Sequence, residues 1–458
     1  MIRTALAATA LLLAAPAAAQ NQQEALDARY DRALAAGYKA LMLCGAIANA
    51  EANGVARSPE SVAQWELSGI QAPMDAYVAD LPWTIQRRAT GVMSEVAVNW
   101  AEDMPPRIAL YRGRETGCAL LPVGAEGSRG GPPHVPRAPR GKPVIDQPMK
   151  AANASLGAVV ERAIKGTGYG TKARTTAVLV RRGGADVAEA YAPGFDANTP
   201  QRTFSVAKSI AATLVGMSVL RGEADVKASA GLGLSDSDPR RAITIDHLLR
   251  MASGRYSDTP GNRTDPLYYG GASVDEVALN WPLVSPPGST YRYANNDTLA
   301  AVAAIKGGLA KHPPAELFAK LGMRGTVSET DWQGDYILSS QVWATAGDLA
   351  KLGELYLNDG KLADGTRILP EGWVKYVSTP SGPQPATGTF GYGAGFWLMN
   401  REEGVPPDTF SANGNRGQYV VIVPSRNVVI VRRGEDPVGS NFDIAAFTRD
   451  VLAALPGG

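Results

Sequence analysis

The sequence predicts an α/β (α+β) protein with a discontinuous antiparallel sheet, flanked by helices and carrying an inserted, mainly helical domain. Apolar strand-like runs open the main unit, return only near its end, and enclose a long stretch of helical patterns. An N-terminal accessory module precedes this unit. We divide the chain into a signal peptide at 1–19, the α+β module at 20–122, a Pro/Gly-rich linker at 123–145 and a main domain at 146–458, whose helical insertion spans roughly 210–380.

Length and charge limit the classes of function. A chain of 458 residues with 45% hydrophobic residues can bury a large core and has room for two or three domains. Its net charge of +1 argues against nucleic-acid binding, which usually requires a strong basic excess. The two cysteines and three histidines show no ligand spacing, so we expect neither a metal nor another cofactor.

The first residues predict an export signal. Arg3 supplies a positive start, an apolar run follows at 5–15, and three small residues provide a cleavage site near Ala19. The run is too short to favour a membrane-spanning helix, although an uncleaved anchor is the alternative. Because no later segment has eighteen apolar residues in a row, we expect a soluble periplasmic or secreted protein without a stable membrane span.

The module at 20–122 combines one long helix with short strands. Apolar residues recur at helical spacing over 24–50, and strand-like runs follow at 96–100, 108–111 and 118–121. In an exported protein, Cys44 and Cys118 most simply form one disulfide, which would join the helix to the last of these strands. Two free, buried thiols are the alternative.

The main domain is expected to begin and end with elements of the sheet. In chain order we expect a helix at 153–164, a hairpin of strands 175–180 and 187–191, helices at 244–251 and 345–356, strands at 392–398, 418–423 and 428–433, and a closing helix at 442–455. An active site would then lie in the cleft between the sheet and the helical insertion.

A serine and a lysine at helical spacing are the strongest chemical signal. Ser205-Val206-Ala207-Lys208 opens an apolar, Ala-rich helical run. Lys208 falls on the same helix face as Ser205, where its amine can take the hydroxyl proton. The helix N-terminus adds free N–H groups that stabilise an oxyanion. The alternative is a serine near a helix start beside a solvated lysine.

None of the three histidines is expected to act as the base for Ser205. Histidine is the usual partner of a nucleophilic serine. Here His134 lies in the linker, His312 precedes two prolines, and His247 belongs to a helix whose apolar face packs inward.

Tyr293-Ala294-Asn295 supplies two further candidates. A phenol close to Lys208 has its ionised form favoured, and it could relay a proton between Ser205 and the leaving group. The Asn295 amide could hydrogen-bond both the lysine and a substrate carbonyl. Most tyrosines, however, are packing residues.

The turn Gly414-Asn415-Arg416-Gly417-Gln418 is the last candidate. Its glycines let a ligand approach the backbone closely, which makes Gly414 and Gln418 substrate-binding candidates. An N–H from this strand edge could form an oxyanion hole with the N–H of Ser205. A Gly-rich hairpin entry is the alternative. Tyr268-Tyr269-Gly270-Gly271 is either a lid or ordinary surface.

These pieces, in this order, resemble the penicillin-recognising serine hydrolases, which include class C beta-lactamases, D,D-peptidases and related esterases. Ser205-x-x-Lys208 and Tyr293-x-Asn295 resemble their first two motifs, and the likeness covers about residues 150–456. The chain is most similar to the branch of 6-aminohexanoate-dimer hydrolases and class C-like esterases. That likeness is carried by the stretches 248–254, 321–323, 343–349, 369–373 and 392–397.

The resemblance implies a beta-lactamase-like fold and a role for each matched residue. Ser205 would be the nucleophile, Lys208 would help to deprotonate it, and Tyr293 would pass the proton to the leaving group. The backbone N–H groups of Ser205 and Asn415 would form the oxyanion hole. One motif departs from the family: Ala412-Asn413-Gly414 stands where beta-lactamases carry a Lys-Thr-Gly motif, so the lysine that meets the substrate carboxylate is missing.

We therefore expect an exported serine hydrolase that cleaves a small carboxylic ester or amide, with no nucleic-acid partner. A beta-lactam or D-amino-acid peptide hydrolase of the same superfamily is one alternative. The other is a non-catalytic module on the same fold that binds a ligand or cell-wall material.

Overall fold

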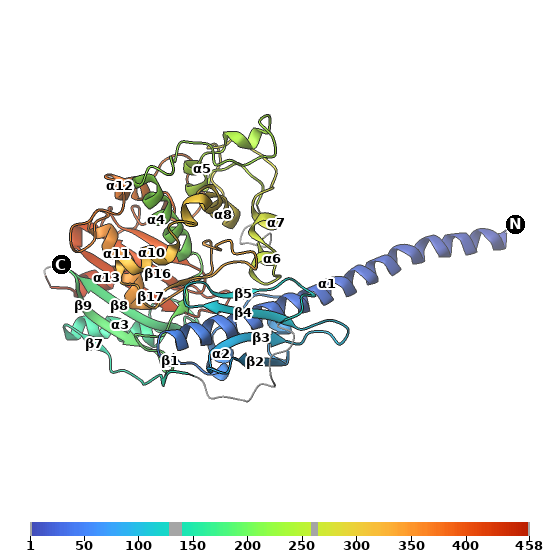
Figure 1. Ribbon diagram of the computed structural model, residues 1–458, viewed down its shortest axis with the longest axis horizontal. Coiled ribbons are helices and arrows are strands. Elements are labelled where there is room, and N and C mark those ends of the chain that lie inside the picture. The colour runs from blue at the N-terminus through green and yellow to red at the C-terminus, as the bar shows by residue number, and fades with distance from the viewer. Residues whose placement is uncertain (1, 128–139, 258–263, 457–458) are drawn as a thin grey trace.

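An eight-stranded antiparallel sheet forms the centre of the main domain, in the order β13-β14-β15-β16-β17-β8-β9-β7 (Figure 1). The computed structural model describes residues 2–127, 140–257 and 264–456, with side chains from Gln20 onward. Strand β17 pairs with β8, so the beginning and the end of the domain meet in one sheet. The strands are Lys150–Ala151 (β7), Thr175–Arg182 (β8), Ala185–Tyr191 (β9), Gly391–Tyr392 (β13), Trp397–Leu398 (β14), Phe410–Gly414 (β15), Gln418–Val423 (β16) and Val428–Gly434 (β17).

Helices cover both faces of this sheet. Successive side chains of a strand point to opposite faces, and in β17 both sets are buried. Val428 and Ile430 join the apolar cluster that includes α3 (Ala154–Ile164) and α13 (Ile444–Ala454). Their neighbours in β17 join the opposite cluster, which includes α4 (Val206–Leu220) and α11 (Ala346–Leu357). Burial on both faces explains why this strand reads as a continuous apolar run.

The insertion between the sheet halves is mainly helical, and this confirms the predicted fold class. Helix α8 packs against α4 and α5, which brings the two catalytic-motif segments together. A small sheet, β10-β12-β11, joins the segment before α4 to the insertion. The elements are Gln201–Arg202 (β10), Ile245–Leu249 (α5), Asp265–Tyr268 (α6), Val274–Ala278 (α7), Asn295–Ala304 (α8), Lys306–Leu309 (α9), Pro314–Leu321 (α10), Val327–Ser328 (β11), Val342–Ala344 (β12) and Trp373–Ser378 (α12).

The N-terminal segment folds as a long helix laid across a four-stranded antiparallel sheet. Helix α1 (Ile2–Ala52) contacts three of the strands and leaves the body of the protein toward its N-terminus (Figure 1). Residues 20–30 are exposed, and burial begins at Ala33. The remaining elements are Val55–Ala56 (β1), Pro59–Trp65 (α2), Trp83–Arg87 (β2), Met93–Val98 (β3), Arg107–Gly113 (β4), Gly117–Leu120 (β5) and Lys142–Pro143 (β6), which pairs with β1.

One helix in the described residues has the length and apolar composition of a membrane span. It is the part of α1 over Gln20–Ala52, and almost all of its most apolar window is buried inside the protein. Burial of this kind is typical of the core helix of a folded domain.

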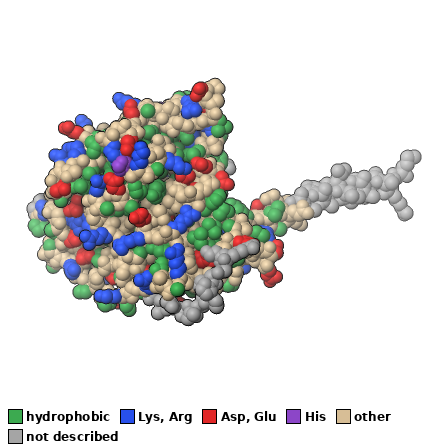
Figure 2. All heavy atoms as spheres, in the orientation of Figure 1, with side chains coloured by type: hydrophobic (Ala, Val, Ile, Leu, Met, Phe, Trp, Pro, Cys, Tyr) green, Lys and Arg blue, Asp and Glu red, His purple; other side chains and the backbone are tan. Residues whose placement is uncertain are grey.

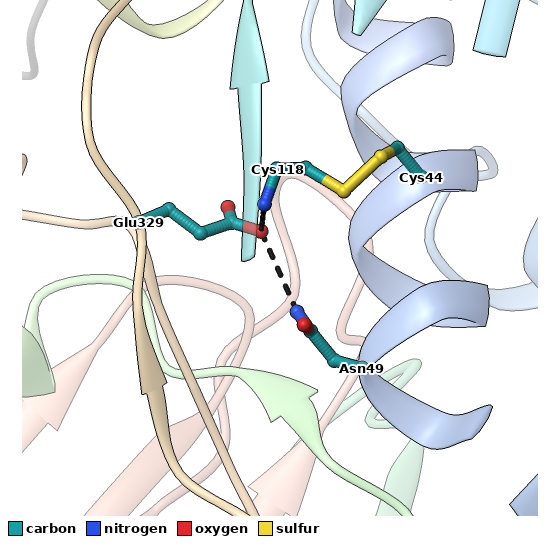
Figure 3. Close-up of a disulfide and its surroundings, with 4 residues drawn as sticks. All are labelled: Cys44, Asn49, Cys118 and Glu329. Carbon is teal, nitrogen blue, oxygen red and sulfur yellow. Dashed lines mark hydrogen bonds between the residues drawn. A yellow bond between two sulfur atoms is a disulfide. The ribbon is translucent and has the colours of Figure 1, made fainter. Parts of the chain in front are cut away.

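A disulfide joins Cys44 of α1 to Cys118 of β5, with Cα atoms 6.1 Å apart (Figure 3). Beside it, Glu329 Oε1 accepts hydrogen bonds from the Cys118 N–H at 3.1 Å and from Asn49 Nδ2 at 3.4 Å. Burial raises the pKa of Glu329 to about 7. Because Glu329 follows β11 of the main domain, this contact ties the N-terminal segment to the rest of the protein.

The N-terminal core is continuous with the main domain. Its apolar cluster includes Leu267, Tyr268 and Trp343 from the insertion. Gly45 of α1 lies so close to the Trp343 ring that an added Cβ would stand 2.5 Å from it. The module is therefore packed into the protein as part of one structure rather than attached at its surface.

Some local predictions were wrong. The strand expected at 392–398 is two short strands, β13 and β14, because a turn with Gly395 at a φ of 79° separates them. Strands β2 and β15 were not predicted. Of the predicted linker, residues 128–139 lie outside the described residues. Figure 2 shows Lys and Arg side chains interspersed with Asp and Glu over the visible face, which agrees with the near-zero net charge.

Candidate active site

Ser205 lies at the N-terminus of α4, directly after a strained residue. Phe204 has a φ of 48°, a conformation that an aromatic side chain rarely adopts. The Arg202 guanidinium packs 4.4 Å from the centre of the Phe204 ring, and the Thr203 N–H donates to Val342 O at 2.7 Å. Strain of this kind persists only where the surroundings hold it, and it is common where a side chain must be presented for chemistry.

Lys208 is buried one helical turn below Ser205. Its Nζ donates to Asn295 Oδ1 at 2.6 Å and to Ser339 O at 2.8 Å, and it lies 2.9 Å from Ser205 Oγ. The side chain is 2% exposed, and this burial lowers the pKa of Lys208 to about 7. A neutral amine keeps two N–H donors for the first two oxygens and turns its lone pair toward the Ser205 hydroxyl. The arrangement suits a base that removes the Ser205 proton.

Tyr293 stands on the other side of the same hydroxyl. Its ring centre lies 5.1 Å from Lys208 Nζ and 5.3 Å from the Trp397 ring centre. Hydrogen bonds with Ser205 and the Trp397 indole lower the pKa of Tyr293, but burial outweighs them and raises it to about 12. The phenolate of Tyr293 is therefore not favoured, contrary to the expectation, because desolvation of the buried hydroxyl outweighs the hydrogen bonds that lower its pKa.

Asn295 bridges Lys208 to the segment before α6. Its Oδ1 accepts from Lys208, and its Nδ2 donates to Thr264 Oγ1 at 3.0 Å. Both ends of the amide are thus engaged within the protein. The predicted contact with the lysine is present, and the predicted contact with a substrate carbonyl stays a prediction, since Asn295 lines the cavity and its Nδ2 has a second N–H.

The turn after β15 approaches the N-terminus of α4. A Cβ added to Gly414 would collide with Thr203 O and stand 3.1 Å from the Ser205 nitrogen, so only glycine fits there. Within the described residues, the backbone N–H groups of Ser205 and Asn415 form no hydrogen bond. Ser205 and Asn415 both line the cavity, so each could present an N–H donor to it, which is what an oxyanion hole requires.

Gln418 does not belong to the site, contrary to prediction. Its side chain is fully buried behind the turn, where Oε1 accepts from Arg433 Nε at 2.6 Å. Its Nε2 donates to the carbonyls of Gly434 and Arg416. Since every polar atom of the side chain is engaged in the sheet, Gln418 is a structural residue.

A cavity of about 830 Å³ opens over Ser205. Eight of the 28 residues in its wall are aromatic, and the wall is shared between the insertion, the sheet edge and the N-terminal segment, which contributes Gln71 and Ala72. Tyr268 and Tyr269, expected to be a lid or surface, line this cavity and are buried. The other aromatic residues in the wall are Phe204, Tyr293, Phe390, Trp397, Tyr419 and Phe442.

Asp265 is a cavity residue that the sequence did not reveal. Its carboxylate forms no hydrogen bond or ion pair in the part of the chain that the structure describes. Burial raises the pKa of Asp265 to about 6, against a weaker opposing effect of Arg202. The local sequence does not distinguish Asp265 from any other aspartate at a helix start. Its position in the cavity wall is set by the tertiary structure.

The two described histidines lie outside the cavity. His247 Nδ1 accepts from the Thr244 N–H at 3.2 Å in the cap of α5, and His312 Nδ1 lies 2.8 Å from Glu316 on the surface. His134 is outside the described residues. A search of the described residues finds no group of three or more His, Cys, Asp or Glu side chains able to hold a metal ion.

Comparisons with known proteins agree with this architecture. The sequence profile of the family named Beta-lactamase matches residues 160–451. The 6-aminohexanoate-dimer hydrolase of Paenarthrobacter ureafaciens is 26% identical over 297 residues, which cover 57% of this chain and 73% of that protein.

A solved structure shows the same fold. A Bacillus anthracis protein described as a candidate 6-aminohexanoate-dimer hydrolase has a TM-score of 0.52 at 22% identity, covering 61% of this chain and 78% of its own. A candidate beta-lactamase from Bacteroides dorei has a TM-score of 0.49 at 19% identity, and the match covers 66% of this chain and 97% of that protein. Since the family profile spans more than half of the sequence, the chain belongs to the beta-lactamase family and is a serine hydrolase.

Proposed function

We propose that the protein hydrolyses a small carboxylic ester or amide through an acyl-enzyme on Ser205. The observation that carries this proposal is the buried Lys208 amine, 2.9 Å from Ser205 Oγ and with a pKa of about 7. A base with a pKa near the working pH combines a large neutral fraction with useful proton affinity.

The proposed reaction has two halves. Ser205 Oγ attacks the carbonyl carbon while its proton moves to Lys208, and the oxyanion faces the N–H groups of Ser205 and Asn415. Tyr293 gives its proton to the leaving alcohol or amine and is reprotonated by the Lys208 ammonium. Water then attacks the carbonyl carbon of the acyl-enzyme. Its proton passes through the same groups to Ser205 Oγ, and the acid product leaves.

The charges in the cavity favour substrates that are neutral or positively charged. Within the described residues the Asp265 carboxylate in the cavity wall has no hydrogen-bond or ion-pair partner, and Ala412 stands at the position where the family motif carries a lysine. The cavity cation Arg416 is already paired with Glu435. A beta-lactam or D-amino-acid peptide, which offers a carboxylate, therefore finds less support here than an ester or a short amide.

Export is part of the same proposal. It is supported by the apolar N-terminus and by the disulfide, which persists in oxidising compartments. Cleavage near Ala19 would cut within α1 before the first buried residue, Ala33, and would leave the core helix complete. N-terminal sequencing of the exported protein tests this point.

Turnover of p-nitrophenyl butyrate, with labelling by a fluorophosphonate, tests the proposed chemistry. We expect Ser205→Ala to abolish both, and Lys208→Ala and Tyr293→Phe to lower kcat by about 10²–10⁴-fold, the usual contribution of acid–base groups. Tyr291→Phe is the matched control, since its hydroxyl has no partner within the described residues and lies outside the cavity. A parent protein that is inactive and unlabelled would refute the proposal.

A further inference from the structure

The turn that carries the Asn415 N–H has a backbone that needs support. Arg416 has a φ of 56° and Gly417 has a φ of 78°. The left-handed conformation is costly for arginine, so it persists only when the surroundings impose it. An oxyanion donor on such a turn is useful only if the turn is held in one geometry.

The Arg416 side chain supplies that support by reaching into the N-terminal segment. Its Nε donates to Glu435 Oε2 at 2.6 Å, and its Nη2 donates to Trp65 O at 2.9 Å and Ser68 O at 2.8 Å. The side chain is 4% exposed. The last residues of α2 have carbonyls without helical partners, which is where a guanidinium binds well.

The segment that receives Arg416 is itself fixed. The Trp65 ring packs edge-on against Phe195, with ring centres 5.1 Å apart, and the Arg174 guanidinium lies 4.6 Å from the Trp65 ring centre. Arg174 also donates to Gln64 O at 2.6 Å and Ser68 Oγ at 2.7 Å. The Trp65–Ser68 carbonyls are therefore rigid acceptors.

The same segment continues directly into the cavity wall. The Val438 N–H donates to Gly69 O at 2.9 Å, and an added Cβ on Gly69 would stand 2.8 Å from Pro437. Gln71, two residues further on, lines the cavity over Ser205 and donates to the Tyr269 hydroxyl at 3.2 Å. The N-terminal segment thus meets both the oxyanion turn and the substrate space.

We propose that Arg416 is a positioning residue through which the N-terminal module holds the oxyanion turn in its catalytic geometry. This inference rests on the proposed function, because it assumes that the Asn415 N–H binds the oxyanion. The module is then an integral part of the active site. This role of the module needs no bound partner or cell-wall material, because its contacts with the turn are formed within the same chain.

The experiment compares Arg416→Met and Arg416→Lys with the parent in the full-length protein. Fluorophosphonate titration first gives the concentration of labelled Ser205, and kcat for p-nitrophenyl butyrate is expressed per labelled site. We expect Arg416→Met to lower kcat per site by about ten- to a hundred-fold, with KM and the pH midpoint of activity unchanged. Arg416→Lys should recover part of the loss, because an ammonium reaches Glu435 or a carbonyl but not all three acceptors.

Arg112→Met is the matched control. Arg112 also joins the N-terminal module to main-domain carbonyls, donating to Asp331 O at 3.1 Å and Trp332 O at 2.6 Å, but it lies away from the cavity. The Arg112→Met substitution should therefore alter only the stability of the protein. Should Arg416→Met fail to fold, Arg174→Met, which releases Ser68 and leaves the turn intact, should show a smaller loss of kcat per site.

The outcomes separate the two proposals. An active parent whose Arg416 variants keep kcat per site within about twofold would overturn the positioning role and leave the hydrolase proposal standing. A loss of labelled sites without a loss of kcat per site would do the same, since it reports stability alone. A parent without turnover or labelling would overturn both.

Discussion

At the residue scale, burial sets the charge of the groups around Ser205. Desolvation disfavours charged forms, so it lowers the pKa of Lys208 to about 7 and raises that of Tyr293 to about 12. At neutral pH these values leave a large fraction of the Lys208 amine unprotonated and the Tyr293 phenol protonated, both beside the Ser205 hydroxyl. In the proposed reaction, that pairing lets Ser205 lose a proton while the leaving group gains one.

This charge state predicts a pH profile. Because only the unprotonated amine accepts the Ser205 proton, kcat/KM should rise with pH, with a midpoint near 7, and then level off. The same midpoint should govern the rate of fluorophosphonate labelling. Lys208→Arg should be inactive across this range, since guanidinium stays protonated. A flat profile between pH 5 and 9 would contradict the role of Lys208.

Asp265 predicts a preference for positively charged substrates. Two p-nitrophenyl esters of equal length, one ending in an ammonium group and one in a methyl group, measure it through their kcat/KM ratio. The ratio should favour the ammonium ester by about tenfold above pH 6 and fall below it, because protonation neutralises the carboxylate. Asp265→Asn should remove the preference and leave the neutral ester unaffected. Equal rates for both esters in the parent would argue against this role.

At the scale of single elements, the site is assembled where element ends converge. The N-terminus of α4 carries Ser205, the first turn of α8 carries Asn295, and the end of β15 carries Gly414. At the end of a helix, several backbone N–H or C=O groups have no hydrogen-bond partner within the helix. Because β15 passes so close to α4, a side chain at position 414 would fill the space beside the Ser205 nitrogen, where the proposed oxyanion would lie.

Gly414→Ala should therefore remove activity without unfolding the protein. The added methyl group would press on Thr203 O and on the Ser205 nitrogen, so we expect kcat to fall by about 10²-fold or more. Gly307→Ala is the matched control, because its Cβ would have no neighbour within 4 Å. Gly307→Ala should unfold near the parent temperature in a thermal melt, and Gly414→Ala somewhat lower but well above the assay temperature. A Gly414→Ala enzyme with parental kcat would place the oxyanion elsewhere.

At the scale of the whole molecule, the N-terminal segment and the main domain share one apolar cluster. The cavity wall is divided between them in the same way. Loosening the N-terminal segment is therefore expected to cost both stability and activity. The disulfide is the covalent link that opposes such loosening.

Replacing both cysteines by alanine should lower the free energy of unfolding by about 2–4 kcal/mol. The bond closes a loop with a sequence separation of 74, and its loss gives the unfolded chain more conformations. Urea unfolding, followed by tryptophan fluorescence, measures the change. Reductant should have the same effect on the parent and none on the double variant. Parental stability of the double variant would show that packing alone holds α1 to β5.

The sequence by itself determined much of this protein. Periodicity predicted β8, β9, β17, α3, α11 and α13. In each of these elements the buried residues recur at the period of a helix or a strand, so the local sequence contains the signal. The spacing of Ser205 and Lys208 on one helix turn is also local, so their contact followed from the sequence. Tyr293 and the turn at Gly414 were candidates from the sequence, and the family resemblance assigned their roles.

The tertiary structure alone decided the electrostatics and the boundaries of the site. The pKa values of Lys208 and Tyr293 depend on desolvation by segments far apart in the chain, which no local pattern encodes. Tertiary packing also decided that Asp265 lines the cavity, which the sequence did not predict. It likewise buried the Gln418 side chain in the sheet, away from the cavity where it was predicted. The place of the N-terminal module beside the oxyanion turn depends on Arg416 meeting the carbonyls of Trp65 and Ser68, and only folding brings groups so distant in sequence together.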